Sequence, residues 1–134
     1  MGTPDRNEWV EKPNDVRDYK DLVAWKVSFE LCMAVYRCSR DFPHDENYGL
    51  RAEVRKTARS VCCNIAEGHE RGSTREFIRF LNIAQGSRAE LETQLCTARE
   101  LGYMPEESAA QLLELADRVG RLVTSLRECL RSRV

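Results

Sequence analysis

The amino-acid sequence predicts an all-α fold, an antiparallel up-and-down four-helix bundle. Three observations lead to this prediction. Apolar residues recur at spacings of three and four in four separate segments, which is the period of amphipathic helices. No segment alternates apolar and polar residues with the period of a strand. The connections between the segments are short, and such helices bury their apolar stripes against one another.

The chain of 134 residues has the length of one domain. Residues 1–18 show no apolar period and are predicted to form an N-terminal arm or a disordered tail, while residues 19–132 form the bundle. The first helix is predicted from Asp21 to Phe42, because the residue before Pro43 disfavours helical backbone. Its apolar stripe is Leu22, Trp25, Phe29, Cys32 or Met33, and Tyr36.

The second helix is predicted over residues 46–67. Its stripe is Leu50, Val54, Ala58, Val61 and Ile65. Gly68 is expected to end it, since glycine is common just after a helix C-terminus. Ser73 then fits the N-cap of a third helix, with Glu76 as the glutamate of a capping box.

The third helix is predicted over residues 74–101. Its stripe, spaced like a heptad seam, is Phe77, Leu81, Ala84, Arg88, Leu91, Leu95 and Ala98. Arg88 interrupts this apolar seam. Gly86 lies inside the helix at a cost of about 1 kcal/mol relative to alanine. Either a neighbouring backbone approaches it closely or it is a tolerated weak point.

Gly102 is predicted to close the third helix, and Pro105 suits the first turn of the fourth. The apolar positions of the fourth helix are Leu112, Leu115 or Ala116, Val119, Leu122 or Val123, Leu126 and Leu130. Arg127, Arg131 and Arg133 near its end suit the negative end of a helix dipole.

Composition excludes a disordered or membrane-spanning chain, because 42% of residues are hydrophobic and 32% are charged. The polar N-terminal segment lacks the apolar core of a secretion signal, so a cytoplasmic protein is expected. The net charge of -1 hides an uneven distribution. Residues 51–88 carry a net +4, residues 89–117 a net -6 and residues 118–134 a net +4.

Residue constellations for catalysis or metal binding are not found in the sequence. A di-iron bundle needs Glu-x-x-His pairs, but Asp41 precedes His44 and Ala66 precedes His69 at that spacing. The six cysteines form no C-x-x-C pair, and we interpret them as small buried hydrophobes. We therefore expect no metal, no cofactor and no enzymatic activity.

Basic residues give the strongest functional signal. Arg51, Arg55 and Arg59 form a single line on the second helix, with Lys56 beside it. Arg75 and Arg79 repeat this spacing on the third helix, and Arg71 lies in the predicted connection between the two helices. Convergent cations suit a phosphate backbone. The alternative is an ordinary solvated face on which these arginines pair with nearby acids.

A second group consists of polar residues at positions that the helical pattern places in or near the core. They are Asn64, Glu67, Arg88 and Glu90. A charge on an apolar seam is costly unless it is paired, so Arg88 must find a carboxylate, reach solvent or cross a subunit interface. Glu67 is one possible partner. We predict structural or interface contacts for this group rather than catalysis.

Several sequence blocks resemble the four-helix-bundle family named after proteins encoded in 23S rRNA intervening sequences. The blocks, which span about residues 18–128, are residues 22–26, 48–50, 55–60 and 64–68, then Arg71, and residues 80–87, 90–95 and 101–103. The most specific is Asn64-Ile65-Ala66-Glu67-Gly68, followed by Ala84-Gln85-Gly86-Ser87. The chain departs from the family at Arg88, where an apolar residue is expected.

The resemblance implies a left-handed antiparallel bundle that assembles as a homo-oligomeric ring, typically a homopentamer. It also implies similarity to the accessory variability determinant of diversity-generating retroelements, which binds nucleic acid and a reverse transcriptase. We therefore expect a non-enzymatic accessory protein whose arginine patches bind RNA or DNA phosphates. The alternative is a protein–protein scaffold, for example for a reverse transcriptase, without direct nucleic-acid binding.

Overall fold

The computed structural model describes residues 16–134, so residues 1–15 of the predicted arm lie outside the described part of the chain. Residues 16–134 contain four α-helices and no strand, as predicted. The helices are α1 (Val23–Ser39), α2 (Leu50–Glu70), α3 (Thr74–Glu100) and α4 (Glu106–Arg131), with short 3-10 helices at Tyr19–Asp21 and His44–Glu46.

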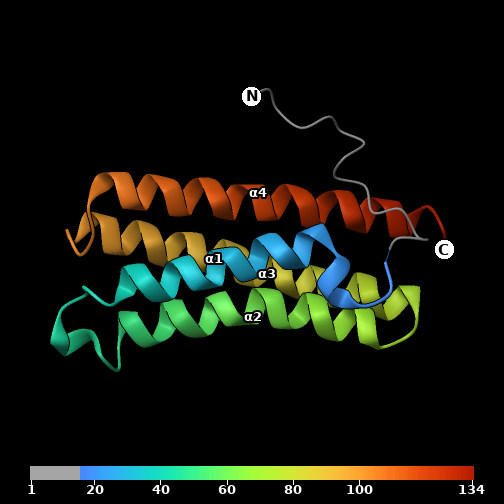
Figure 1. Ribbon diagram of the computed structural model, residues 1–134, viewed down its shortest axis with the longest axis horizontal. Helices are drawn as coiled ribbons and strands as arrows, with labels where there is room; N and C mark the ends of the chain where they lie inside the picture. Colours follow the sequence, from blue (N-terminus) through green and yellow to red (C-terminus); the bar gives the residue numbers. More distant parts are fainter. Residues whose placement is uncertain (1–15) are drawn as a thin grey trace.

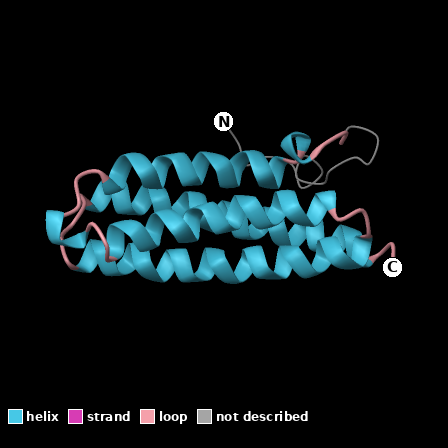
Figure 2. Ribbon diagram, turned by 90° about the horizontal axis from the view of Figure 1, so that it is seen from below, coloured by secondary structure: helices cyan, strands magenta, loops and turns pink. Residues whose placement is uncertain are grey.

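The four helices lie side by side along one long axis (Figures 1 and 2). α1 packs against α2 and α4, and α3 packs against the same two helices. The α2–α3 turn and the last turn of α4 lie at one end of the bundle, on the right in Figure 1. The connections after α1 and after α3 lie at the opposite end.

The core confirms the apolar stripe predicted for α3. All six apolar members of that stripe are buried, and Arg88 is half-buried among them. The stripe predicted for α1 is confirmed only in part, because Leu22 and Cys32 are buried while Trp25 and Tyr36 are half-buried against the core. Val27, Leu31 and Val35 fill the core, whereas the side chain of Phe29 is 42% exposed. Apolar residues cover more than half of the circumference of α1, so spacing alone does not select its buried face.

The end of α2 differs from the prediction. The helix begins at Leu50 and continues through Gly68 to Glu70. Gly68 is buried where α2 packs against α3, and a Cβ atom at this position would lie 2.7 Å from Cβ of Phe80. Close approach therefore explains this glycine. The left-handed turn residue is Gly72, with φ of 81°.

The start of α3 confirms Ser73 as its N-cap, because the Ser73 hydroxyl oxygen accepts the Glu76 N–H at 3.1 Å. The Glu76 carboxylate pairs with Arg79 at 3.2 Å, which is a different contact from the reciprocal bond of a capping box. Gly102 follows the helix with φ of 73°, as expected for a closing glycine.

Gly86 lies on an open surface of α3. A Cβ atom there would meet no described atom within 4 Å. The close approach that the sequence suggested as one explanation for this glycine does not occur within residues 16–134. Close approach occurs instead at two other helical glycines. A Cβ atom at Gly68 would collide with Phe80, and a Cβ atom at Gly120 of α4 would collide with the side chain of Arg88.

Candidate functional site

Arg51, in the first turn of α2, holds the end of α1. Its Nε donates to the carbonyl oxygen of Ser39 at 2.9 Å, and its two Nη atoms donate to Phe42 O and Asn47 Oδ1. The last carbonyls of a helix have no partner inside the helix and carry its partial negative charge. Arg51, on the neighbouring helix, supplies hydrogen-bond donors to these carbonyl groups. Its guanidinium group therefore points into the protein.

Arg55 continues this arrangement one turn further along α2. Its Nε donates to the Ser39 hydroxyl at 2.8 Å and its Nη2 to the carbonyl oxygen of Tyr36 at 3.2 Å. The predicted line of arginines thus begins with two side chains that cap α1. Arg55 does not pair with an acid, as the alternative interpretation expected, because its acceptors are carbonyl and hydroxyl oxygens.

Arg59 and Lys56 are the exposed members of the predicted line. Arg59 donates to the Tyr36 hydroxyl, and its Cζ lies 6.0 Å from the centroid of the Tyr36 ring. The Cζ of Arg55 lies 4.9 Å from the same centroid. One ring therefore holds two guanidinium groups, a cation–π arrangement that leaves most of the Arg59 side chain in solvent.

Arg71, Arg75 and Arg79, which we call the turn cluster, surround the α2–α3 turn and are all exposed. The Cζ atoms of Arg71 and Arg79 lie 5.0 and 5.3 Å from the ring centroid of Phe80, so one aromatic ring positions both. Arg75 makes no hydrogen bond or ion pair with any residue from 16 to 134. Sequence reasoning placed these three cations together, and the structure brings them to one end of the bundle.

The ion pairs between the turn cluster and the neighbouring acidic side chains are weak. Arg71 pairs with Glu67 at 2.7 Å, and both side chains are about half exposed. Glu67 is therefore not the partner of Arg88 that the sequence suggested. Ion pairs between exposed side chains contribute only about 0–1 kcal/mol. A phosphate can replace these carboxylates at small cost.

The basic surface extends from α3 to α4. Arg131 and Arg133 are exposed at the end of α4, which lies at the same end of the bundle as the turn cluster (Figure 1). Arg127 joins the two helices by donating from Nη1 to Asn82 Oδ1 at 2.9 Å. Sequence reasoning assigned these cations only to the helix dipole. The long-range contact with Asn82 has no signal in the sequence.

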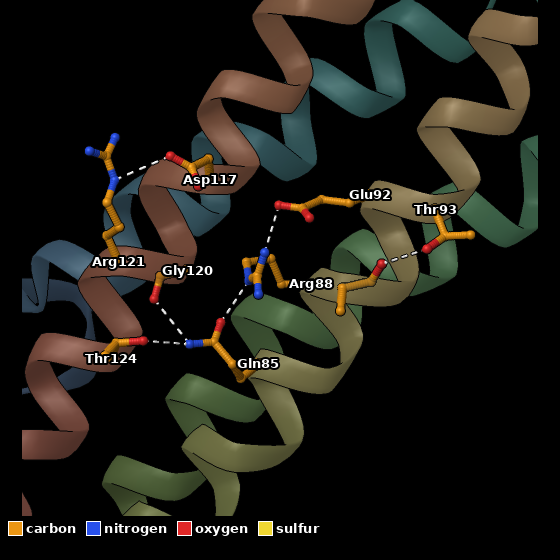
Figure 3. A network of polar contacts seen from close by, with 9 residues as sticks. Gln85, Arg88, Glu92, Thr93, Asp117, Gly120, Arg121 and Thr124 are labelled. Atoms are coloured by element: carbon orange, nitrogen blue, oxygen red, sulfur yellow. Dashed lines mark hydrogen bonds and ion pairs between the residues drawn. The ribbon is translucent and has the colours of Figure 1, made fainter.

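Arg88 lies between α3 and α4 inside a polar network (Figure 3). Its Nε donates to Gln85 Oε1 at 2.6 Å, and its Nη1 donates to Glu92 Oε1 at 2.6 Å. Gln85 in turn donates to the Gly120 carbonyl at 3.0 Å and to Thr124 Oγ1 at 2.9 Å. The carboxylate that Arg88 requires is thus Glu92, one turn away on the same helix.

Gly120 makes room for Arg88. A Cβ atom at Gly120 would lie 2.6 Å from the Nε of Arg88. The arginine occupies the space that a larger residue on α4 would fill. Sequence reasoning missed Gly120, although a glycine inside an apolar helix opposite an arginine on an apolar seam is a signal that could have found it.

The remaining polar candidates are Asn64 and Glu90, which lie beside a hydrogen bond that joins α2 to α3. Asn64 Nδ2 donates to the Ser60 carbonyl at 2.7 Å, and the hydroxyl groups of Ser60 and Ser87 share a hydrogen bond at 2.8 Å across the two helices. Glu90 is exposed beside this contact, at the rim of a shallow pocket that Lys56 also lines. Asn64 thus makes its hydrogen bonds within α2, to the residue one turn before it.

The six cysteines are free thiols, and only Cys32 and Cys62 are buried. A hydrogen bond with Cys32, together with burial, raises the pKa of the Cys62 thiol well above its usual range. Cys63 is exposed, which corrects the prediction of small buried hydrophobes for that residue. Within residues 16–134, no group of three or more His, Cys, Asp or Glu side chains is arranged to hold a metal ion.

A groove with a volume of about 690 Å³ lies between α1 and α4. Apolar side chains such as Ala34 and Leu115 line it together with charged ones, among them Arg37, Arg118 and Glu114. None of the helices between residues 16 and 134 combines the length and apolar composition that a membrane-spanning segment needs.

Comparison with known proteins matches the chain to a family model and to solved structures. A family model described as 23S rRNA-intervening sequence protein matches residues 20–125. A crystal structure from Bacteroides thetaiotaomicron VPI-5482, described as a protein with unknown function from the S23 ribosomal protein family, has a TM-score of 0.73 and 20% sequence identity. The match covers 79% of this chain and 96% of that one, and it shows the fold alone. No curated protein matches the chain.

Proposed function

Because the chain belongs to the 23S rRNA-intervening sequence protein family, we propose that it is a non-enzymatic accessory protein that binds nucleic acid in the cytoplasm. The description of the family associates its members with an intervening sequence of an RNA, which favours RNA over DNA as the ligand. The phosphate backbone is the part of the ligand that this protein contacts.

The exposed turn cluster carries this proposal. Arg71, Arg75 and Arg79 present three guanidinium groups at one end of the bundle, and Phe80 positions two of them. Guanidinium groups bind phosphate oxygens in a bidentate geometry. The exposed Lys56 and Arg59 are secondary contacts, whereas Arg51 and Arg55 are occupied at the end of α1.

A homo-oligomeric ring of antiparallel up-and-down bundles, most simply a pentamer, is part of the proposal. The resemblance of the sequence to ring-forming proteins supports it. A ring repeats a modest cationic patch and converts weak single contacts into avidity. Light scattering at micromolar concentration should give a mass of several protomers, and the mass of a single protomer would refute the ring.

The proposal is tested by fluorescence anisotropy with structured RNA, single-stranded RNA and duplex DNA at low and near-physiological salt. We expect saturable binding that weakens steeply with salt, because phosphate contacts release counterions. The variant Arg71→Gln/Arg75→Gln/Arg79→Gln should bind at least tenfold more weakly, with a salt slope reduced by roughly two to three units.

A matched control separates specific contacts from total charge. The variant Arg37→Gln/Arg40→Gln/Arg121→Gln removes the same number of exposed positive charges elsewhere on the bundle. It should bind almost as the unmodified protein does. Equal weakening in both variants would show that net charge, and not the turn cluster, governs binding. Arg55 is unsuitable for such a test, because its replacement also removes contacts at the end of α1.

The groove between α1 and α4 favours a second candidate function, a protein–protein scaffold. Its mixed apolar and charged lining suits a peptide segment better than a phosphate backbone. A reverse transcriptase is the partner suggested by the resemblance to retroelement accessory proteins. Association with a purified reverse transcriptase that survives nuclease treatment and is lost in Arg118→Glu would support this function, whereas association lost on nuclease treatment would count against it.

A further inference from the structure

One side of α1 carries aromatic rings that sequence analysis had assigned to the core; Trp25 and Tyr36 are half-buried against the core, and Phe29 is exposed. Trp25, Phe29 and Tyr36 follow one another at spacings of four and seven residues, which places them on one side of the helix. The rings of Trp25 and Phe29 are stacked, with centroids 5.1 Å apart and planes 10° from parallel. Phe29 is 42% exposed, so its ring is open to solvent over much of its surface.

Cations accompany these rings at both ends of the row. The guanidinium groups of Arg55 and Arg59 lie over the Tyr36 ring, as described above. At the start of α1, the Tyr19 ring contacts the edge of Trp25 with centroids 5.4 Å apart, and Lys20 Nζ lies 5.7 Å from the Tyr19 centroid. Among residues 16–134, Arg59 forms no ion pair with a carboxylate, whereas Arg55 is bound to the end of α1.

We propose that this aromatic strip, consisting of Tyr19, Trp25, Phe29 and Tyr36, binds the unpaired bases of a single-stranded nucleic acid. Bases stack on aromatic side chains whatever their identity, while neighbouring cations hold the backbone. Trp25 and Tyr36 are eleven residues apart on one helix, a distance of about 16 Å. Several stacked nucleotides, at about 3.4 Å each along one strand, fit this length.

The inference rests on the proposed nucleic-acid binding and adds a preference for single strands. A base pair inside a duplex does not expose its faces, so the strip gains nothing from a duplex beyond phosphate contacts. The turn cluster, by contrast, contacts phosphates in either form of the ligand. The strip and the turn cluster therefore make separable contributions: the strip determines strand preference and the cluster determines most of the salt dependence.

Charge favours a nucleic acid over a second copy of the chain as the occupant. A second copy that covered the rings would also desolvate the Arg59 guanidinium and the Lys20 ammonium group nearby. Burying such cations is unfavourable unless the second copy places its acidic segment, residues 89–117, opposite them. A phosphate backbone supplies the negative charge along the whole length of the strip.

The test compares a labelled single-stranded oligouridine with an RNA duplex by fluorescence anisotropy. Phe29→Leu keeps apolar bulk but removes the stacking surface, and it should weaken single-strand binding by about tenfold. Duplex binding should change less than twofold. Phe29→Tyr should restore single-strand binding. Tyr48→Ala, which removes an aromatic ring that is 99% exposed outside the strip, is the matched control and should have no effect.

Tryptophan fluorescence gives a second readout that a merely structural role for Phe29 would not change. In a Trp9→Phe background, Trp25 is the one remaining tryptophan of the chain, and bound oligouridine should quench its emission in proportion to binding. The duplex should not quench it. Saturable single-strand binding without any quenching would overturn the inference, because the bases would then lie elsewhere.

The outcomes distinguish this inference from the proposed function. If no nucleic acid binds at low salt, both fail. If the turn-cluster variant loses binding while Phe29→Leu binds oligouridine like the unmodified protein, the proposed function holds and the aromatic strip does not. If Phe29→Leu lowers the mass in solution without changing oligouridine affinity, the strip is a contact between copies, and the inference is refuted.

Discussion

Replacing Gly120 with alanine tests how α3 and α4 pack around Arg88. The new Cβ atom would lie 2.6 Å from Nε and 2.9 Å from Cδ and Cζ of Arg88. The end of the Arg88 side chain can shift, but a shift distorts its bonds to Gln85 and Glu92, each 2.6 Å long. The collision therefore forces either strain or the loss of a charge-assisted hydrogen bond.

Two opposing effects set the magnitude. Overpacking costs about 1–3 kcal/mol, and hydrogen bonds to charged groups contribute a similar amount. Alanine in place of glycine inside a helix recovers about 1 kcal/mol. We expect Gly120→Ala to lower the free energy of unfolding by about 1 kcal/mol. In an Arg88→Ala background the obstacle is gone, so the same substitution should raise it by about 1 kcal/mol.

Urea unfolding followed by circular dichroism measures all four proteins of this double-mutant cycle. Protomer concentration must be held constant, because association contributes to apparent stability. Gly86→Ala is the control, since it lies in the open on α3 and should stabilise both backgrounds by about 1 kcal/mol. A coupling between Gly120 and Arg88 below about 0.5 kcal/mol, the usual limit of additivity, would refute the reasoning.

Three further predictions concern other contacts. Arg51→Ala should lower the free energy of unfolding by about 2–3 kcal/mol by leaving the end of α1 unsatisfied, and Arg51→Lys should not restore it, because lysine lacks the planar fork; full rescue in urea unfolding would contradict this. Gly68→Ala should cost about 1–3 kcal/mol through its collision with Phe80, and an unchanged urea midpoint would contradict the close approach. Partial burial raises the pKa of the Cys63 thiol, so iodoacetamide should label this exposed cysteine slowly at neutral pH and faster as the pH rises toward 9. Intact-mass analysis should show that the buried Cys62 stays unmodified until the protein unfolds. Equal labelling of Cys62 and Cys63 would contradict the assigned burial.

Sequence patterning predicted the helices well where only one face is apolar. The α3 stripe is buried as expected, and Ser73 caps that helix. On α1, where two faces are apolar, the prediction was right only in part. Leu22 and Cys32 are buried as expected, but Trp25 is only half-buried and Phe29 is exposed, while the smaller Val27 and Leu31 fill the core. Side-chain size is a weaker guide than the requirement that α1 contact both α2 and α4.

The candidate site was predictable as a set of cations but not as an arrangement. Spacing correctly placed Arg51 and Arg55 on one line of α2, yet it could not show that the end of α1 lies opposite that line. The partner of Arg88 was also beyond the reach of spacing alone. It is a local acid, Glu92, and the space that the arginine occupies comes from Gly120, 32 residues away in the chain.

The contacts at the end of α1 also bear on how the chain folds. The bonds from Arg51 and Arg55 join residues only 9 to 19 positions apart, so each closes a short loop at small entropic cost. Contact between α1 and the connection before α4, such as Cys38 with Met104, joins positions 66 residues apart. The α1–α2 hairpin should therefore form before α4 docks. In a fold dominated by such local contacts, the two arginines act early in folding, and their removal should slow folding as well as accelerate unfolding.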